Sequence, residues 1–179
     1  ATPEPEEPAI ESNPLRNVYF GETHMHTAYS LDAYIGGTRL TPNDAYRFAK
    51  GEAVNVDGKS HQRKRPLDFV AISDHAEYIG EMYSTMTEGA PGHDQELLQQ
   101  LRALSSLEER QKWFLQYVVN NNRGDNPSHP PFFAGPETTR SAWQIMIDDA
   151  EQNNEPGRFT ALIAFEWSGA PNGGNLHRN

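Results

Sequence analysis

Apolar residues of the chain gather in three stretches of strand length. The first, RNVYFGETHMHT (residues 16–27), contains the β-forming residues VYF. The other two, LDFVAIS (67–73) and RFTALIAFEW (158–167), are nearly continuous apolar runs. Such runs are typical of parallel strands that are buried on both faces. The pattern therefore predicts three strands, the last two of them buried.

Between these stretches, apolar residues recur at helical spacing. One helix is predicted to begin after an N-cap at Thr41, with Pro42 at its first position, and to end at Gly51. A hairpin is predicted over residues 53–65, through the dipeptide DG. Further helices are predicted over residues 76–86, 93–105, 106–121 and 138–154.

The alternation of strands and helices predicts an α/β protein with a parallel sheet, either open or closed into a barrel. A chain of 179 residues has room for one full-sized domain. In α/β folds the reacting groups lie at the carboxyl ends of the strands. We therefore look for chemistry in the residues that follow each predicted strand.

The composition of the chain argues against several classes of function and limits the possible metal ligands. The formal net charge of -10 argues against a protein that binds nucleic acid, because such binding depends on clustered Lys and Arg. No apolar run approaches the roughly 18 residues that a membrane-spanning helix needs. The chain contains no cysteine, so any metal site must use histidine and carboxylate ligands.

Two histidines and an acid follow the first strand. In a strand, residues i and i+2 share a face and lie about 7 Å apart, so His24 and His26 are expected to project the same way. Two neutral imidazoles at a strand end form half of a site for Zn, Mn or Fe. A pair of surface or hydrogen-bonded histidines is the alternative. Asp32 can bridge or complete a metal pair, or serve as a turn or cap residue.

The other two strands also end in ionisable residues. Asp74 and His75 follow the second strand. Because neighbouring side chains alternate, Asp74 is expected behind His75, as an acceptor that orients its ring. Glu166 ends the third strand, where an acid is costly to bury unless it is paired or metal-bound; a salt bridge is the alternative. His177 reaches the same edge if a further strand begins there. Glu77 is either a ligand or a helix-start charge, and the second interpretation is preferred.

Together these motifs resemble the polymerase and histidinol phosphatase (PHP) superfamily of metallo-phosphoesterases. That family has H-x-H-[TS] with a later Asp or His, then a strand ending in [TS]-D-H, then an acid at a strand end. The matching residues are His24, His26, Thr27 and Asp32, then Ser73, Asp74 and His75, then Glu166. The resemblance covers residues 17–179 and is closest to a branch of long bacterial PHP-like proteins described as a domain of unknown function.

The resemblance implies a fold and a metal complement. The fold would be the N-terminal part of a distorted (β/α)7 PHP-type barrel with helical insertions. It would hold two or three divalent metal ions (Mn, Zn or Fe). His24, His26 and Glu166 would serve one ion, with Glu166 bridging, while Asp32, His75 and His177 would serve the others.

The ends of the chain lead to two further expectations. A complete PHP site needs one more His and a late D-x-H pair, so we expect the remainder of the same polypeptide, its C-terminal portion, to supply them. Residues 1–16 are expected to be a disordered acidic, Pro-rich leader before the domain at 17–179. An Ala start fits cleavage of a signal peptide, which favours a periplasmic or secreted protein over a trimmed chain or a cytoplasmic protein.

The expected function is metal-assisted hydrolysis of a small-molecule phosphate ester, with catalytic roles for Glu166 and Asp74. Arg178 is a candidate phosphate clamp or an ordinary surface residue. Hydrolysis of sulfate esters or amides on the same site is the nearest alternative. Others are a non-catalytic exported module that binds metal or ligand, and a helical interaction protein built on residues 94–155.

Overall fold

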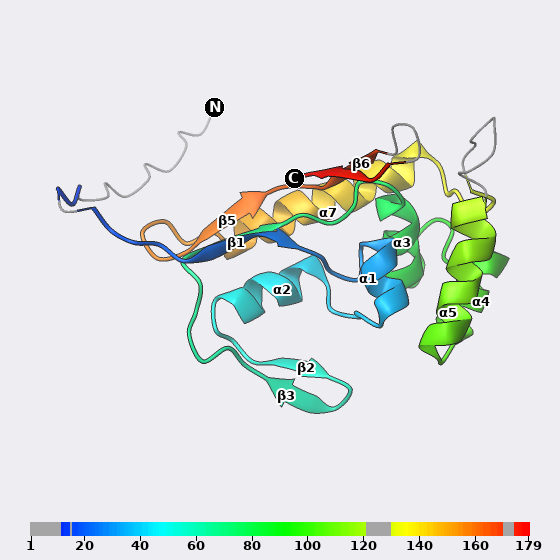
Figure 1. Cartoon of the computed structure of the whole chain (residues 1–179), viewed down its shortest axis with the longest axis horizontal. Coiled ribbons are helices and arrows are strands. Elements are labelled where there is room, and N and C mark those ends of the chain that lie inside the picture. The colour runs from blue at the N-terminus through cyan, green and yellow to red at the C-terminus, as the bar shows by residue number, and fades with distance from the viewer. Residues whose placement is uncertain (1–11, 15, 121–129, 170–173) are drawn as a thin grey trace.

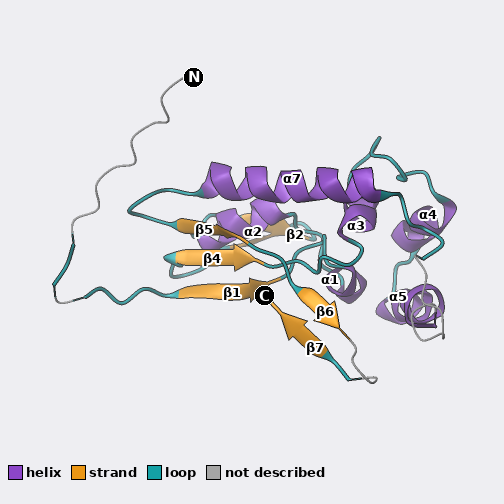
Figure 2. Ribbon diagram, turned by 90° about the horizontal axis from the view of Figure 1, so that it is seen from above, coloured by secondary structure: helices purple, strands orange, loops and turns teal. Residues whose placement is uncertain are grey.

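Three parallel strands form the central sheet of the protein. The computed structural model describes residues 12–14, 16–120, 130–169 and 174–179. The strands β1 (Gly21–Met25), β4 (Phe69–Ile72) and β5 (Thr160–Ile163) lie in the order β1-β4-β5 (Figure 2). Val70 pairs with Glu22 on one side and with Ala161 on the other. The predicted parallel sheet is confirmed.

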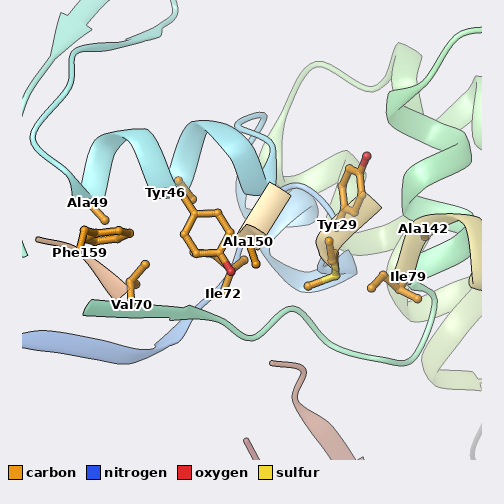
Figure 3. Close-up of a cluster of buried hydrophobic side chains, with 11 residues drawn as sticks. Tyr29, Tyr46, Ala49, Val70, Ile72, Ile79, Ala142, Ala150 and Phe159 are labelled. Carbon is orange, nitrogen blue, oxygen red and sulfur yellow. The ribbon is translucent and has the colours of Figure 1, made fainter. Parts of the chain in front are cut away.

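Two helices pack on this sheet. Helix α2 (Pro42–Ala49) begins with the predicted N-cap: Thr41 accepts a hydrogen bond from the Asp44 amide, and the Asp44 carboxylate accepts one from the Thr41 amide. Helix α7 (Pro136–Asn153) runs alongside the strands (Figure 2). The core between these helices and the sheet is drawn in Figure 3 and includes Tyr46, Val70, Ile72, Ala150 and Phe159.

A second layer of helices lies beyond the carboxyl ends of the strands (Figures 1 and 2). It consists of α1 (Leu31–Gly36), α3 (Ile79–Met86), α4 (Glu96–Ala103), α5 (Leu107–Phe114) and the π-helical turn η1 (Leu115–Val119). Most of their buried residues form a separate apolar cluster around Met82, Leu98, Leu101 and Trp113, joined by Phe132 from the segment before α7. Helix α1 has only six residues and was not predicted.

Two antiparallel pairs complete the described elements. Strands β2 (Val54–Val56) and β3 (Lys59–His61) form the predicted hairpin, with Asp57 and Gly58 both at positive φ, as a tight hairpin turn requires. Strands β6 (Trp167–Gly169) and β7 (Leu176–Arg178) pair just beyond β5. The further strand expected after residue 169 is therefore present.

The expectation that the third strand is buried on both faces is wrong. β4 fits it, since Val70, Ala71 and Ile72 are all at most 4% exposed. In β5, however, Leu162 and Ile163 are 39% and 45% exposed, because among the described residues β5 pairs only with β4 and its outer side is uncovered.

The fold class is mixed α/β, and the strands of the described ranges do not close into a barrel. Most of the expected leader, residues 1–11 and 15, lies outside the described residues. Among the described helices, none is long and apolar enough to cross a membrane.

Candidate metal centre

Backbone contacts hold the carboxyl ends of the three strands together. The Ser73 amide donates to the Met25 carbonyl at 2.9 Å, which joins the ends of β4 and β1. His75 and Glu166 form a parallel β-bridge beyond β4 and β5, in which the Glu166 amide donates to Asp74 and the Ala76 amide donates to Glu166. The residues that follow each strand therefore meet at one edge of the sheet, as the sequence predicts.

Glu166 is the centre of this meeting point and is fully buried. The Nε2 atoms of His24 and His26 lie 2.7 Å and 2.8 Å from the same Glu166 oxygen, Oε2. The other oxygen, Oε1, contacts Nδ1 of His177. His24 and His26 thus share a face, and both imidazoles reach an acid that is 142 and 140 residues further on (166 − 24 and 166 − 26).

Asp32 and His75 extend the cluster. Asp32 Oδ2 lies 3.4 Å from His75 Nε2, and Asp32 Oδ1 lies 3.9 Å from His26 Nδ1. The imidazole rings form a row, with centroids 5.0 Å apart for His24 and His26, 4.7 Å for His26 and His75, and 5.2 Å for His75 and His177. All six residues predicted as metal ligands are therefore neighbours in one cluster.

These six side chains form three overlapping donor groups. Within each group, one donor atom per residue lies within 4.8 Å of the others. The groups are His24, His26 and Glu166; His26, Asp32 and His75; and His75, Glu166 and His177. Three of the residues belong to two groups each, so ions held in neighbouring groups would share ligands.

Ser30 fixes the tautomer of His26. Its hydroxyl donates to Asp74 Oδ1 at 2.8 Å, and its oxygen accepts from the His75 amide at 2.9 Å. Since the hydroxyl has one proton, the contact of 2.7 Å with His26 Nδ1 requires Nδ1 to be the donor. The Nε2 lone pair of His26 is therefore left to face the cluster.

Asp74 lies behind the cluster, but not in the expected place. It is fully buried and accepts hydrogen bonds from the amide and hydroxyl of Thr27, both at 2.6 Å, as well as from Ser30. Burial raises the pKa of Asp74, and these hydrogen bonds act in the opposite direction. Asp74 thus supports His26 through Ser30 and has no direct hydrogen bond to the ring of His75.

Two further polar residues hold the rings of His75 and His177. Ser168 Oγ lies 2.8 Å from His75 Nδ1, and Asn175 Oδ1 lies 2.6 Å from His177 Nε2. In each ring, the nitrogen that points away from the cluster is hydrogen-bonded to this polar residue, as is usual for histidines that ligate a metal. The sequence carries only a weak signal for Ser168, its i+2 spacing from Glu166.

The electrostatics favour a bound cation. Burial by itself raises the pKa of Glu166, but hydrogen bonds to His177 and His24 outweigh it and lower that pKa. Burial likewise acts to raise the pKa of Asp32, and its hydrogen bond with His75 lowers it. Both acids are therefore ionised at neutral pH. Two imidazole nitrogens facing one carboxylate oxygen, with a second carboxylate nearby, are a donor set that suits Zn, Mn or Fe.

The comparisons with known proteins place the chain in a family without supplying an activity. Residues 13–179 match the family described as "Protein of unknown function (DUF3604)". The chain belongs to this family. No curated protein and no solved structure matches the chain. The function of this DUF3604 protein must therefore be argued from the site.

Arg178 does not join the cluster in this DUF3604 protein. It neighbours His177 on β7, and successive side chains of a strand point to opposite faces. Arg178 instead lines a separate cavity with Trp143, Phe165 and Trp167. This position does not support a role as a phosphate clamp at the cluster.

Glu77 lies closer to the cluster than the sequence analysis expected. Helix α3 starts only at Ile79, so Glu77 lies outside the helix. Its Oε1 accepts a hydrogen bond of 3.0 Å from the Ser168 amide, and its Oε2 lies 3.8 Å from His75 Nδ1. Glu77 is thus a neighbour of His75 and contributes a second negative charge to that side of the site.

Proposed function

We propose that this DUF3604 protein is a metal-dependent hydrolase of phosphate esters. The observation that carries the proposal is the set of three overlapping donor groups around the buried carboxylate of Glu166. The PHP-like motifs support the choice of phosphate esters as substrates. The proposed ligands are His24, His26, Asp32, His75, Glu166 and His177.

The proposed chemistry divides between the ions and the chain. Divalent ions in such a site polarise a phosphoryl oxygen and lower the pKa of a bound water. The residues of the chain hold the donor atoms in place before substrate arrives: Ser30 fixes His26, Ser168 fixes His75 and Asn175 fixes His177. An ester can approach from the open side, because the side chain of Asp32 is 58% exposed.

We also propose that the sheet is part of a PHP-type barrel, completed by the remainder of the same polypeptide. The uncovered apolar residues of β5 and of the segment that follows it support this, because a large exposed apolar area marks a contact surface. The residues concerned are Leu162, Ile163, Phe165 and Trp167, each at least 39% exposed.

Metal analysis followed by a substrate panel tests the function. The purified protein, loaded with Mn, Zn or Fe, would be assayed with an aryl phosphate, a phosphodiester, an aryl sulfate and an anilide. We expect bound metal and turnover of the phosphate substrates. Turnover of the sulfate or the anilide alone would show that the substrate is a sulfate ester or an amide instead. Bound metal without any turnover would favour a binding module.

A matched pair of histidine variants tests the site. His24→Ala removes a ligand that contacts Glu166, and should lower metal content and activity together. His61→Ala, on the exposed β3 strand, is the control and should change neither. Full activity at unchanged metal content in His24→Ala would exclude the proposed centre.

A further inference from the structure

A cavity of about 510 Å³ opens directly beside the donor cluster. Resting on the proposed function, we propose that this cavity binds the leaving group of the substrate, and that this group is uncharged, apolar and of aromatic size. The substrate class would then be phosphate esters of phenols or similar apolar alcohols, rather than sugar phosphates or nucleotides.

The cavity has two walls of different chemistry. One wall consists of donor residues, Asp32, His75 and His177, so a group in the cavity touches two of the three donor groups. The apolar wall comes from α1, from Tyr78 and from the end of α5 with η1. Its residues are Leu31, Tyr78, Phe114, Val118 and Val119. A phosphoryl group held by the donors would therefore direct its ester substituent against the apolar wall.

Charge defines what this substituent can be. Among the described residues, the lining contains no Lys or Arg, and Glu77 is its only acid apart from Asp32. A second phosphate or a carboxylate on the substrate would find no cationic side chain among these described residues and would meet Glu77. Two other polar residues of the lining, Ser168 and Asn175, are already engaged with His75 and His177, and the rest of it is largely aliphatic and aromatic carbon. Sugar hydroxyls would therefore find few hydrogen-bond partners, which is unfavourable for a polar group. An uncharged apolar group avoids both costs.

The apolar wall is held in shape by the packing behind it. Leu31 and Val118 are 3% and 4% exposed and belong to the apolar cluster that contains Trp113 and Phe132. Tyr78 stacks near Phe132, with ring centroids 5.9 Å apart, and its backbone has a φ of 66°. A bulky residue in this left-handed conformation is strained, and such strain is concentrated at functional sites. The volume also lies within the range of about 300–1,000 Å³ typical of small-molecule sites.

Binding of two phosphonates that share a head group tests the inference without turnover. The probes are 1-naphthylmethylphosphonate and methylphosphonate, titrated calorimetrically into the protein loaded with Mn. We expect the naphthyl compound to bind at least about tenfold more tightly, because its ring buries apolar surface that the methyl group lacks. Equal affinities would overturn the inference.

Variants test whether the preference for the naphthyl compound arises in this cavity. Val119→Glu places a carboxylate on the partly exposed side of the apolar wall, and should remove most of the naphthyl preference. The readout is the ratio of the two phosphonate affinities, in which an effect of the new charge on the shared head group cancels. Leu115→Glu is the control, since Leu115 lies in the same turn, is 52% exposed and does not line the cavity. Phe114→Ala removes a ring without adding charge and serves if Val119→Glu does not fold. A preference that survives in the folded variants would exclude this cavity.

Hydrolysis of 1-naphthyl phosphate, measured separately, distinguishes the two proposals. Naphthyl preference in binding without hydrolysis would contradict the phosphoesterase function and leave the apolar pocket in place. Hydrolysis of naphthyl phosphate and glycerol phosphate with equal kcat/KM, together with equal phosphonate affinities, would support the phosphoesterase function and contradict the apolar leaving-group pocket.

Discussion

Ser30 Oγ and Asp74 Oδ1, 44 residues apart in the chain, are joined by a hydrogen bond of 2.8 Å. Because the single hydroxyl proton of Ser30 is committed to Asp74, the serine can only accept from its other two partners, His26 and the His75 amide. One buried carboxylate thus determines which nitrogen of His26 is left for a metal.

Ser30→Ala should weaken metal binding although Ser30 is not a ligand. The Nδ1–H of His26 loses its acceptor, so the ring can turn or change tautomer, and we expect a loss of about 10- to 100-fold in affinity for Mn or Zn. The Asp74 carboxylate also loses a hydrogen-bond donor, which should lower the unfolding free energy of the metal-free protein by about 1–3 kcal/mol. Calorimetric titration and urea denaturation measure the two effects.

Ser60→Ala, on the exposed β3 strand, is the matched control and should alter neither quantity. If Ser30→Ala lowered the unfolding free energy but left the metal affinity unchanged, the hydrogen bond would be structural only, and Ser30 would not fix the tautomer of His26.

The overlap of the donor groups predicts unequal losses of metal from different variants. Glu166 belongs to two of the three groups, whereas His24 belongs to one. Glu166→Gln should therefore lower the number of bound ions twice as much as His24→Ala. Elemental analysis of the dialysed proteins, expressed as ions per chain, gives the comparison.

Glu108→Gln serves as the control for Glu166→Gln, because Glu108 is exposed on α5 and pairs only with Lys112 among the described residues. Its metal content should equal that of the unchanged protein. Equal losses in Glu166→Gln and His24→Ala would mean that Glu166 does not bridge two positions.

The parts of this site that the sequence predicts are those governed by backbone geometry. The spacing of His24 and His26 is enough to place both rings on one face, and the apolar run before Asp74 is enough to make β4 a buried parallel strand. The carboxyl ends of parallel strands then bring Glu166 to the same edge.

What the sequence does not predict depends on contacts made only in the folded chain. Asp74 could have supported either neighbouring histidine, and the choice of His26 follows from the position of Ser30. The exposure of β5 depends on what covers it, which its apolar sequence does not reveal. Arg178 is adjacent to His177, but the alternation of β7 directs it elsewhere.

Metal binding should weaken as the pH falls, at a pH set by Asp32 and His75. The hydrogen bond to Asp32 raises the pKa of His75 above its ordinary value of 6.5. In the metal-free protein this raised pKa contributes stability that is fully present below pH 6.5 and is lost as the pH rises through the raised value. A metal needs the neutral ring, so its affinity has the opposite dependence and falls as the pH drops through the raised pKa.

The titration of the His75 ring in the metal-free protein, followed by NMR, checks the cause. Asp32→Asn should lower the midpoint towards the ordinary value, because it removes both the strongest hydrogen bond and the nearest charge. Asp57→Asn, in the exposed β2–β3 turn, should leave the midpoint where it is. An unchanged midpoint in Asp32→Asn would show that the two side chains are not paired in solution.

Tyr46 should link the stability of the core to alkaline pH. Its hydroxyl donates a hydrogen bond of 3.0 Å to the Leu162 carbonyl, and burial raises its pKa from 10.0 to about 12. Because the folded-state pKa is the higher one, this group contributes stability that is complete below pH 10.0 and is lost as the pH rises through about 12. Tyr46→Phe should cost about 0.5–1.5 kcal/mol at neutral pH and reduce the loss above pH 10.

Denaturant unfolding at neutral and alkaline pH measures both consequences of Tyr46→Phe. Some alkaline loss should remain in the variant, since burial also raises the pKa of Tyr29 to about 12. Tyr19→Phe is the control, because Tyr19 is 62% exposed, and its neutral stability should stay within about 0.5 kcal/mol of the unchanged protein. If Tyr46→Phe kept the full loss of stability at alkaline pH, the Tyr46 hydroxyl would not be buried against β5, and α2 would not pack on the sheet as described.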